Sequence, residues 1–508
     1  AEPSRFTAAM DKVILNRFLG LPIFLFVMYL MFLLAINIGG ALQPIFDAGS
    51  VAVFIHGIQW LGYTLHFPDW LTVFLAQGIG GGINTVLPLV PQIGMMYLFL
   101  SFLEDSGYMA RAAFVMDRLM QALGLPGKSF VPLIVGFGCN VPSVMGARTL
   151  DAPRERLMTI MMAPFMSCGA RLAIFAVFAA AFFGQNGALA VFSLYVLGIV
   201  MAILTGLMLK HTIMRGEASP FVMELPVYHV PHIKSLIIQT WQRLKGFVLR
   251  AGKVIVIVSI FLSALNSFSL SGKVVDNIND SALASVSRVI TPVFKPIGVH
   301  EDNWQATVGL FTGAMAKEVV VGTLNTLYTA EDIQNEEFNP QTFSLGEELL
   351  AAVDETWQGL KDTFSLSVLA NPIEASKGDG EMATGAMGVM GSKFGSAAAA
   401  YSYLIFVLLY IPCISVMGAI ARESSRGWMT FSILWGLNIA YSLSTLYYQT
   451  VSFSDHPRYS LVCILAVVLF NVVLFGLLRR ARSRVDVSLL ATRKTPASCC
   501  SSPAGDCH

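Results

Sequence analysis

Hydrophobic residues along this 508-residue chain gather in long runs, and short polar stretches separate them. A helix that crosses a membrane needs about 20 mainly apolar residues, and eight of the runs meet this requirement. The eight runs are residues 20–38, 83–103, 157–183, 187–209, 254–270, 400–421, 428–449 and 459–478. The pattern therefore predicts about eight transmembrane helices.

Two further apolar runs differ in kind from these eight. Prolines and glycines interrupt residues 129–147 (SFVPLIVGFGCNVPSVMGA), and Lys317 and Glu318 stand side by side in the middle of residues 304–328. Irregular backbone is tolerated at membrane depth only where protein buries it or where it lines a cavity. We therefore expect re-entrant segments here rather than ordinary spans.

The composition agrees with a membrane protein and excludes other classes. Only 13% of the residues are charged, against about 25% in soluble proteins, while 55% are hydrophobic and the mean hydropathy is +0.65. So few charges cannot cover a soluble surface, and so many apolar residues exclude a disordered chain. A net charge of +1 gives no field to hold nucleic acid. Seven cysteines are too few for a disulfide framework over this length.

Lysine and arginine concentrate on the cytoplasmic side of membrane proteins, so their distribution predicts the topology. Residues 39–82 contain neither and are expected outside. The basic residues that mark cytoplasmic segments are Arg5, Lys12, Arg17, Arg111, Arg118, Lys128, Arg148, Arg154, Arg156, those between Lys210 and Lys253, Arg422, Arg426 and the final RRARSR. These assignments are consistent with one another only if residues 129–147 enter and leave the membrane from the cytoplasm and residues 304–328 enter and leave it from outside. Both termini are then cytoplasmic.

Two broken segments that enter from opposite faces indicate an inverted-repeat transporter with a site near the membrane midplane. We therefore predict an all-α polytopic membrane protein with about eight transmembrane helices and two re-entrant gate segments in an inverted repeat. The alternative is that one odd run is a true span and one charge assignment is wrong. The expected parts are a lead-in (1–19), a first span and outside loop (20–82), a first gate repeat (83–209), a cytoplasmic amphipathic connection (210–253), a second gate repeat (254–449) with an acidic outside loop (331–395), a last span (450–478) and a cytoplasmic tail (479–508).

Three of these parts are expected outside the membrane core. Residues 232–253 alternate basic and apolar residues at helical spacing, which is typical of an interfacial helix. Residues 331–362 hold nine Asp or Glu and one Lys, so this outside loop is strongly acidic. The tail ends in CCSSPAGDCH, and its Cys499, Cys500, Cys507 and His508 are soft ligands that suit an acceptor or sensor of incoming metal. A tail without structure or function is the alternative.

The string GFGCNVPSVMGART (136–149) carries the clearest chemistry. Glycines flank Cys139, and Pro142 removes a backbone donor and blocks a regular helix. Such a break exposes main-chain carbonyls, those near Gly138 and Asn140, beside a thiol. The combination suits a cation that accepts oxygen and soft sulfur together. A buried cysteine that acts as a small hydrophobic residue is the alternative.

Two other intramembrane cysteines follow a proline in the same way. Cys168 lies after Pro164 in APFMSCGAR, and Cys413 follows Pro412 directly in YIPCISVMG. Each is a candidate metal ligand, with simple packing as an equal alternative. Cys463 sits in the regular run SLVCILAVV and is interpreted as a core or lipid-facing residue.

Several charged and sulfur-containing residues are further candidates for metal binding or gating. Lys317 and Glu318 mark a functional site by default, because bare charge is costly in a membrane; an ion pair that holds the hairpin is the alternative. Glu104 and Asp105 either attract an exiting cation or cap the next helix beside Ser106. The methionines near the breaks are Met145, Met166 and Met387, although Met is more often core filler than ligand.

One motif is misleading. Residues 122–129 (ALGLPGKS) fit a relaxed phosphate-loop pattern, but that loop needs a preceding strand and a following helix to hold phosphate. A helical stretch is expected before this segment and a re-entrant segment after it. We therefore expect no nucleotide site in this chain.

Taken together, five strings resemble the membrane region of the FeoB-type ferrous iron transporters of bacteria. They are GFGCNVPSVMGART, LEDSGYMARAAFVMDR, MAPFMSCGAR, GAMAKEVVVGTL and YIPCISVMGAIARE, and the resemblance runs over essentially the whole chain. It implies Fe(II) uptake across the cytoplasmic (inner) membrane, with Fe(II) as the substrate. It also implies that the two re-entrant segments are gates and that the thiols of Cys139, Cys168 and Cys413 are the metal-ligand candidates.

The resemblance further implies a GTP-dependent protein with an N-terminal G domain, and this chain begins at AEPSRFTAAMDK without one. We interpret the chain as the membrane permease region of a longer protein, not itself an enzyme. The implied partners are membrane lipids, the G domain, small cytoplasmic Feo-type accessory proteins and further copies in a homo-oligomer.

Two rival classes remain open. A nucleoside-type solute transporter uses similar paired hairpins, but its site would be rich in amides and carboxylates rather than Cys, Met and Gly. A thiol-dependent membrane enzyme would need a base beside a cysteine. None of the eight histidines falls inside an expected span.

Overall fold

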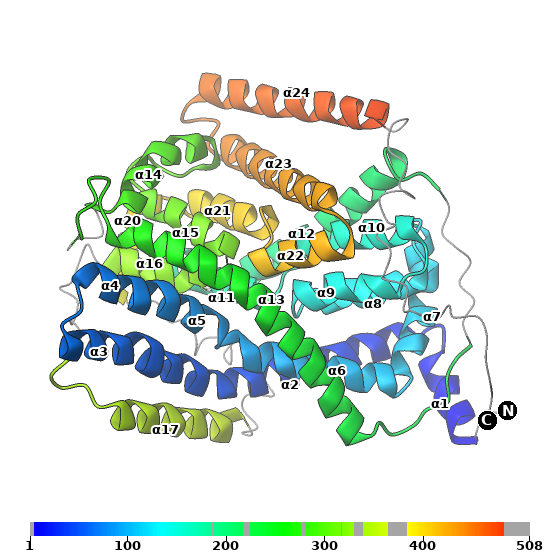
Figure 1. Cartoon of the computed structure of the whole chain (residues 1–508). Helices are drawn as coiled ribbons and strands as arrows, with labels where there is room; N and C mark the ends of the chain where they lie inside the picture. The colour runs from blue at the N-terminus through cyan, green and yellow to red at the C-terminus, as the bar shows by residue number, and fades with distance from the viewer. Residues whose placement is uncertain are drawn as a thin grey trace, which may run out of the picture.

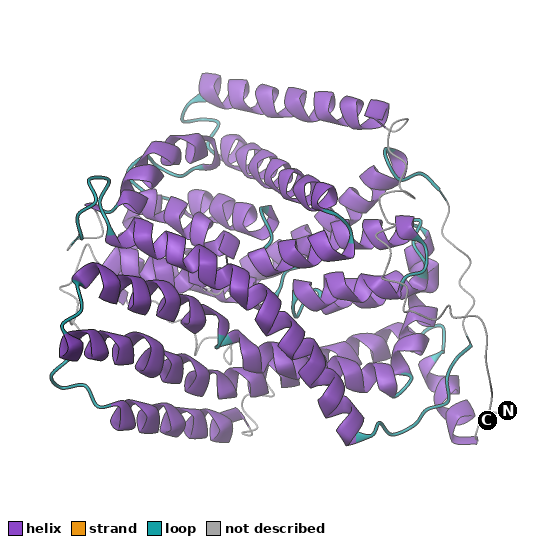
Figure 2. Cartoon of the chain, in the orientation of Figure 1, coloured by secondary structure: helices purple, strands orange, loops and turns teal. Residues whose placement is uncertain are grey.

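The computed structural model describes residues 5–183, 186–216, 224–275, 280–315, 317, 319–329, 339–363 and 384–481. Regular structure in these residues is helical, apart from one isolated bridge between Phe268 and Val274 (Figure 2). The prediction of an all-α polytopic protein is confirmed at this level. Most helices run along one common direction, from the turns at one end of the molecule to those at the other (Figure 1).

Residues 20–105 form a long antiparallel pair of helical segments. One segment ends at His66, which adopts a left-handed conformation with φ of 56°, and the other returns after Pro68. The outgoing segment comprises α2 (Gly20–Ser50), a π-helical turn (Val51–His56) and α3 (Gly57–Leu65); the returning one comprises α4 (Asp69–Val73), a π-helical turn (Phe74–Gly80), α5 (Gly81–Val86) and α6 (Leu89–Asp105).

The prediction of an outside loop over residues 39–82 is therefore wrong, since this stretch is almost entirely helical. Two of its polar side chains find partners on neighbouring helices: Gln43 accepts from Gln92 over 3.1 Å, and His56 lies 2.9 Å from Glu348. A stretch without Lys or Arg is as typical of a membrane span as of an outside loop. Residues 37–65 are in fact long and apolar enough to cross a membrane, so His56 lies within a candidate span, contrary to our expectation for the histidines.

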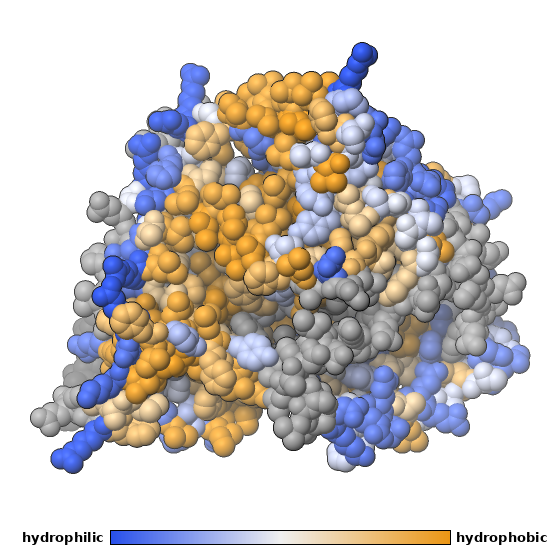
Figure 3. Space-filling model, turned by 180° about the vertical axis from the view of Figure 1, so that it is seen from behind, coloured by the Kyte–Doolittle hydropathy of each residue, from blue (hydrophilic) through white to orange (hydrophobic). Residues whose placement is uncertain are grey.

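Four helical stretches of the described residues are long and apolar enough to span a membrane. They are Asn37–Leu65, Leu189–His211, Ala397–Glu423 and Pro457–Ala481. The last of these is α24 (Pro457–Ala481), which packs against α23 (Arg426–Val451) and exposes most of its apolar residues. Figure 3 shows hydrophobic residues spread across the middle of one face, with hydrophilic residues gathered along both edges. Such a large apolar belt indicates a membrane-facing surface.

Helix α13 (Ile233–Ser267) joins two parts that the sequence separated. The expected interfacial helix 232–253 and the expected span 254–270 form one continuous rod, roughly 50 Å long at 1.5 Å per residue. The rod crosses the molecule obliquely and packs against α5 and α6 (Figure 1). A separate helix lying in the interface is thus ruled out, because no residue in 233–267 breaks the helix.

Both odd runs fold as helical hairpins. Hairpin 1 consists of α8 (Phe130–Val135) and α9 (Asn140–Gly146), and Ser143 donates to the carbonyl of Pro132 over 2.6 Å across it. Hairpin 2 consists of α15 (Trp304–Met315) and α16 (Val319–Thr329). Gly313 lets its two arms approach closely, since a Cβ there would lie 2.7 Å from Val320.

The two hairpins lie at opposite ends of the molecule (Figure 1). Hairpin 1 lies in the half that also contains α1 (Arg5–Ile14), and hairpin 2 lies in the half that contains the turn between α3 and α4. Two re-entrant segments of opposite orientation would be arranged in this way. The inverted symmetry itself stays a prediction.

A discontinuous helix follows each hairpin along the chain. The expected span 157–183 is interrupted between α10 (Pro153–Met162) and α11 (Gly169–Phe178), and the expected span 400–421 is interrupted between α21 (Ala397–Leu409) and α22 (Ile414–Glu423). Pro164 and Pro412 stand in these interruptions, because proline cannot donate the next helical hydrogen bond. After each discontinuous helix the chain continues into a long helix, α12 (Gly187–His211) or α23.

The remaining helices connect these parts. They are α7 (Tyr108–Gln121), α14 (Ala282–Ile290), α17 (Leu345–Thr363) and α20 (Thr384–Phe394). The expected acidic loop 331–395 is therefore partly helical: α17 packs against α2, and α20 packs against α16. Residues 331–338 and 364–383 of that loop lie outside the described residues.

Candidate metal centre

Three cysteines share one structural position: each stands directly before a helix and directly after a break. Cys139 is the N-cap of α9, and Cys413 is the N-cap of α22. The carbonyl of Cys168 accepts the N–H groups of Arg171 and Leu172 at 3.1 and 3.3 Å, which begins α11. The first N–H groups of a helix have no partner within the helix and carry partial positive charge. All three thiols are half-buried at such ends.

The breaks at Cys139 and Cys168 touch each other. The N–H of Gly169 points to the carbonyl of Gly138 at 3.4 Å. Asn140, with its amide nitrogen turned toward the hairpin tip, donates to the carbonyls of Gly136 at 2.9 Å and Met166 at 3.2 Å. Hairpin 1 is therefore held against the first discontinuous helix by backbone carbonyls and one buried amide.

Arg171 holds the backbone at the break before Cys168. It is fully buried, and its Nη1 donates to the carbonyls of Pro164 at 3.0 Å and Met166 at 2.9 Å. In the sequence, Arg171 is a charge within an apolar run, and this is the signal that could have marked it as a site residue. A guanidinium can satisfy several carbonyls at once, which explains how an irregular turn is tolerated among apolar helices.

The break at Cys413 is held by the tip of hairpin 2. Lys317 is buried; its Nζ donates to the carbonyl of Ile411 over 3.0 Å and lies 3.5 Å from the ring centroid of Tyr410. Tyr410 in turn donates to the carbonyl of Leu310 on α15 over 2.9 Å. Lys317 thus docks hairpin 2 onto the break, which favours a gating role over a metal-binding one. Its neighbour Glu318 lies outside the described residues.

The helices that begin at Cys139 and Cys413 run side by side. Helices α9 and α22 pack together, and beyond their C-terminal ends Arg148 forms an ion pair with Glu423. Since these two residues lie at the same end of the pair, the helices are parallel. Cys139 and Cys413 are consequently at the same, opposite end.

Each thiol also has a tyrosine hydroxyl within electrostatic reach. The pairs are Tyr97 with Cys139, Tyr195 with Cys168 and Tyr410 with Cys413. The hydroxyl of Tyr97 also contacts the sulfur of Met145 at 3.6 Å. Tyr410 stands three residues before Cys413 in the sequence, whereas Tyr97 and Tyr195 come from other helices and no local spacing identified them.

The methionine candidates differ in their positions. Met145 lines a cavity next to hairpin 1, whereas Met166 is buried and its carbonyl accepts a hydrogen bond from Arg171. Met387 lies on α20, which packs against α16. Met145 is therefore the candidate that faces open space.

Glu104 and Asp105 do not cap α7. The N-cap of α7 is Gly107 with φ of 88°, and no side chain bonds to it. Glu104 instead pairs with Arg243 at 3.2 Å and lines a cavity of about 420 Å³ that reaches Tyr97 and Met145. The capping interpretation is wrong, since a left-handed glycine already ends one helix and begins the next.

The candidate ligands are not gathered into one cluster. Among the residues that the structure describes, no group of three or more His, Cys, Asp or Glu side chains is close enough to hold a metal ion. Cys499, Cys500 and Cys507 of the tail lie outside the described residues. The described arrangement offers single thiols at three breaks.

The Gate family, described as "Nucleoside recognition", matches residues 86–182 and 248–426, and the family described as "Ferrous iron transport protein B C terminus" matches residues 191–243. No solved structure matches the chain.

The relatives are closely similar over the whole chain. Proteins named "Fe(2+) transporter FeoB" are 91% identical in Salmonella typhimurium strain LT2 and 89% identical in Escherichia coli strain K12. Each alignment covers 100% of this chain and 66% of the relative, so the chain spans about two thirds of their length. The chain therefore belongs to the FeoB family of ferrous iron transport proteins.

Proposed function

We propose that this chain carries Fe(II) across the bacterial cytoplasmic membrane and that Cys139 is its principal ligand. The observation that supports this most is the position of the three thiols, each at the start of a helix and directly after a break. Two of the breaks meet through Gly138 and Gly169. The relatives' name, "Fe(2+) transporter", agrees with Fe(II) as the substrate.

The ligand set matches the chemistry of Fe(II). This ion is intermediate in softness, so a thiolate combined with carbonyl oxygen holds it, whereas Mg(II) and Ca(II) prefer oxygen alone. The carbonyl of Gly138 is the best placed oxygen, because its present donor, at 3.4 Å, is a long and weak one. The main-chain carbonyl of Asn140 is the second candidate. Zn(II) and Cu(II) compete, since the Irving–Williams order favours them.

A transport site must also release its ion, so we expect few ligands and a movable support. Cys168 and Cys413 approach the ion as the hairpins move. In the present arrangement, Arg171 holds the break at Cys168 and Lys317 holds the break at Cys413. The ligand form of cysteine is the thiolate, so binding releases a proton and weakens as the pH falls. Uptake is expected to decline in parallel.

We further infer how the chain is placed and coupled. Helix α1 and the C-terminal end of α24 lie at the same end of the molecule in Figure 1, which supports both termini on one side, the cytoplasmic one. GTP hydrolysis belongs to the N-terminal G domain that the resemblance implies, with small Feo-type proteins and further copies of the chain as partners. Residues 495–508 act as a thiol acceptor for metal; deleting them should change uptake or its regulation.

A nucleoside-type transporter is the competing function, because the Gate family carries that description. A nucleoside site needs amides and carboxylates that face a cavity. Asn140 is instead bonded to two carbonyls, and the breaks present Cys, Met and Gly. These observations favour the metal.

The test is anaerobic binding and uptake of ⁵⁵Fe(II), with a nucleoside and Zn(II) as competitors. Cys139→Ser keeps the shape but replaces sulfur by a hard, poorly ionised oxygen, and it should abolish or strongly reduce uptake. Cys463→Ser on the regular helix α24 is the matched control and should have almost no effect. Full Fe(II) uptake by the Cys139→Ser protein would reject the thiolate site, and displacement of Fe(II) by a nucleoside alone would favour the competing function.

A further inference from the structure

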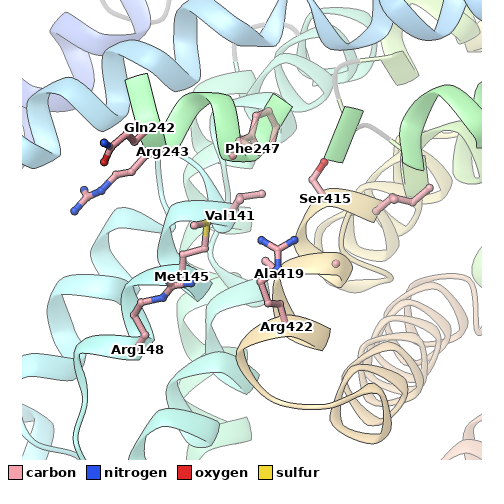
Figure 4. Close-up of a pocket in the computed structure, with 12 residues that line it drawn as sticks. Val141, Met145, Arg148, Gln242, Arg243, Phe247, Ser415, Ala419 and Arg422 are labelled. Carbon is pink, nitrogen blue, oxygen red and sulfur yellow. The ribbon is translucent and has the colours of Figure 1, made fainter. Parts of the chain in front are cut away.

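A cavity of about 320 Å³ lies between α9, α13 and α22. Figure 4 shows it from the side, with α13 above and the two parallel helices below. It extends along α9 and α22 from Val141 and Ile414, near their N-termini, to Arg148 and Arg422 at their opposite ends. The proposed transport chemistry makes no use of it.

The lining is strongly basic at one end. Arg148, Arg243 and Arg422 line the cavity together with Gln242, and no carboxylate is among the described lining residues. In Figure 4 the guanidinium of Arg422 reaches between α9 and α22 toward α13. Glu423 and Glu104 pair with Arg148 and Arg243 from outside the lining, which fixes two of the three guanidinium groups at the cavity's edge.

The remainder of the lining is apolar and open. Val141, Met145, Phe247, Ile414 and Ala419 form it. Gly246 on α13 and Gly418 on α22 also line the cavity, and a Cβ added at either would meet no atom within 4 Å. The glycines therefore keep space for something larger than a side chain.

We infer that this cavity binds the phosphate group of an anionic phospholipid. Guanidinium groups bind phosphate oxygens with paired, charge-assisted hydrogen bonds, and basic pockets between membrane helices on the cytoplasmic side bind lipid headgroups. The apolar part next to the arginines accommodates the start of an acyl chain. A free phosphate has the same anionic chemistry but makes no use of that apolar part.

The position of the cavity gives the lipid a specific effect. Helices α9 and α22 carry Cys139 and Cys413 at one end and Arg148 and Arg422 near the other. A phosphate held by Arg148 and Arg422 links the two helices in the same way as the ion pair between Arg148 and Glu423. The lipid would thereby stabilise the present spacing of the two cysteine-bearing helices. Lipid binding itself does not depend on the identity of the transported ion.

The experiment measures lipid retention by the purified chain in detergent, using native mass spectrometry. The probes are dioleoyl-phosphatidylglycerol, dioleoyl-phosphatidylcholine and inorganic phosphate. We expect phosphatidylglycerol to bind at least tenfold more tightly than phosphatidylcholine. Arg422→Gln should weaken phosphatidylglycerol binding about tenfold, since a charge-assisted bond of this kind contributes roughly one power of ten.

Two further variants separate charge from shape. Gly418→Leu fills the cavity while every arginine stays, and it should weaken phosphatidylglycerol binding as strongly as Arg422→Gln. Arg426→Gln removes an exposed arginine just beyond α22 that does not line the cavity, and it should bind as the unaltered chain does.

Three results would overturn the inference. They are equal binding of the two lipids, equal effects of Arg422→Gln and Arg426→Gln, and unchanged binding in Gly418→Leu. Binding of inorganic phosphate with no preference between the lipids would assign the cavity to a soluble phosphate instead. Because the readout is a bound lipid, failure of the Fe(II) proposal leaves this result unaffected.

Discussion

Lys317, at the tip of hairpin 2, lies 3.5 Å from the ring centroid of Tyr410 and donates to the next carbonyl, that of Ile411, over 3.0 Å. One buried side chain thus joins the re-entrant tip to the break that precedes Cys413. A hydrogen bond from a charged group contributes about 1.5–3 kcal/mol, and a desolvated cation–π contact contributes about 2 kcal/mol. These contacts are strong enough to hold the tip of hairpin 2 against the break in a closed gate, and weak enough for the gate to open.

Removing this amine should release the hairpin tip. We expect Lys317→Met to shift the docking equilibrium by about tenfold or more, to expose Cys413 and to lower Fe(II) uptake. Peptide-resolved labelling with N-ethylmaleimide measures the exposure as a faster modification of Cys413. Lys295→Met is the control, because Lys295 is exposed and its ion pair with Glu301, at 3.8 Å, is a long surface contact. Unchanged labelling of Cys413 in Lys317→Met would show that the tip is held by other contacts.

Arg171 should have the corresponding role at the first break. Arg171→Gln removes the charge-assisted bonds to the carbonyls of Pro164 and Met166. The carbonyl of Met166 keeps Asn140 as a donor, whereas a buried carbonyl left without a donor costs about 1–3 kcal/mol. We expect Cys168 to label faster and Fe(II) affinity to fall at least tenfold. Arg171→Lys should restore little, because an ammonium lacks the planar fork. Arg215→Gln, at an exposed site, should match the unaltered chain; equal effects at both positions would contradict this role.

The sequence predicted where the backbone breaks better than where the helices end. Pro164 and Pro412 lie in the interruptions of the two broken spans. The prolines and glycines of residues 129–147 indicated hairpin 1, although Pro142 itself lies in the first turn of α9. The charge at Lys317 indicated hairpin 2 in the same way. Residues 39–82 were misread because an absence of Lys and Arg fits a span as well as an outside loop.

The partners of these breaks were beyond sequence reasoning. Asn140 reaching Met166 joins residues 26 positions apart in the chain, and Lys317 reaching Ile411 joins residues separated by 94 positions. Side-chain direction at an irregular turn depends on the neighbouring helices, which no local pattern specifies. The same holds for the three arginines around the lipid cavity, which come from three separate helices.

A third prediction concerns how α1 is fastened to the rest of the protein. Arg111 on α7 is fully buried; it pairs with Asp11 of α1 at 2.5 Å, donates to the carbonyl of Pro226 at 2.7 Å and lies over the ring of Tyr228. Burial raises the pKa of Tyr228 to about 12, so this ring stays neutral across the physiological range. The cluster joins α1, α7 and the connection that leads to α13.

Asp11→Asn should loosen this junction, because it leaves the buried guanidinium without its counter-charge at a cost of up to about 3 kcal/mol. Hydrogen–deuterium exchange should show lost protection in residues 5–14 while α23 stays protected. The neighbouring substitution Lys12→Gln removes a charge from the same helix without touching Arg111 and should change nothing. Equal exchange in Asp11→Asn and in the unaltered chain would mean that α1 is held by its apolar contacts alone.

The opposite orientation of the two hairpins is the last prediction, and it requires α17 and the connection before α13 to lie on opposite sides of the membrane. Leu350 on α17 is 70% exposed and Val230 in the connection is 87% exposed, so a cysteine at either position is reachable without disturbing the core. In intact cells an impermeant maleimide should label Leu350→Cys and should leave Val230→Cys unlabelled until the membrane is opened, with the native cysteines replaced by serine. The contact of 2.9 Å between His56 and Glu348 keeps α17 against the first helical segment, so we expect the turn after Leu65 on the same outer side. Labelling of Leu350→Cys only after permeabilisation would place both hairpins on one side and remove the inverted repeat.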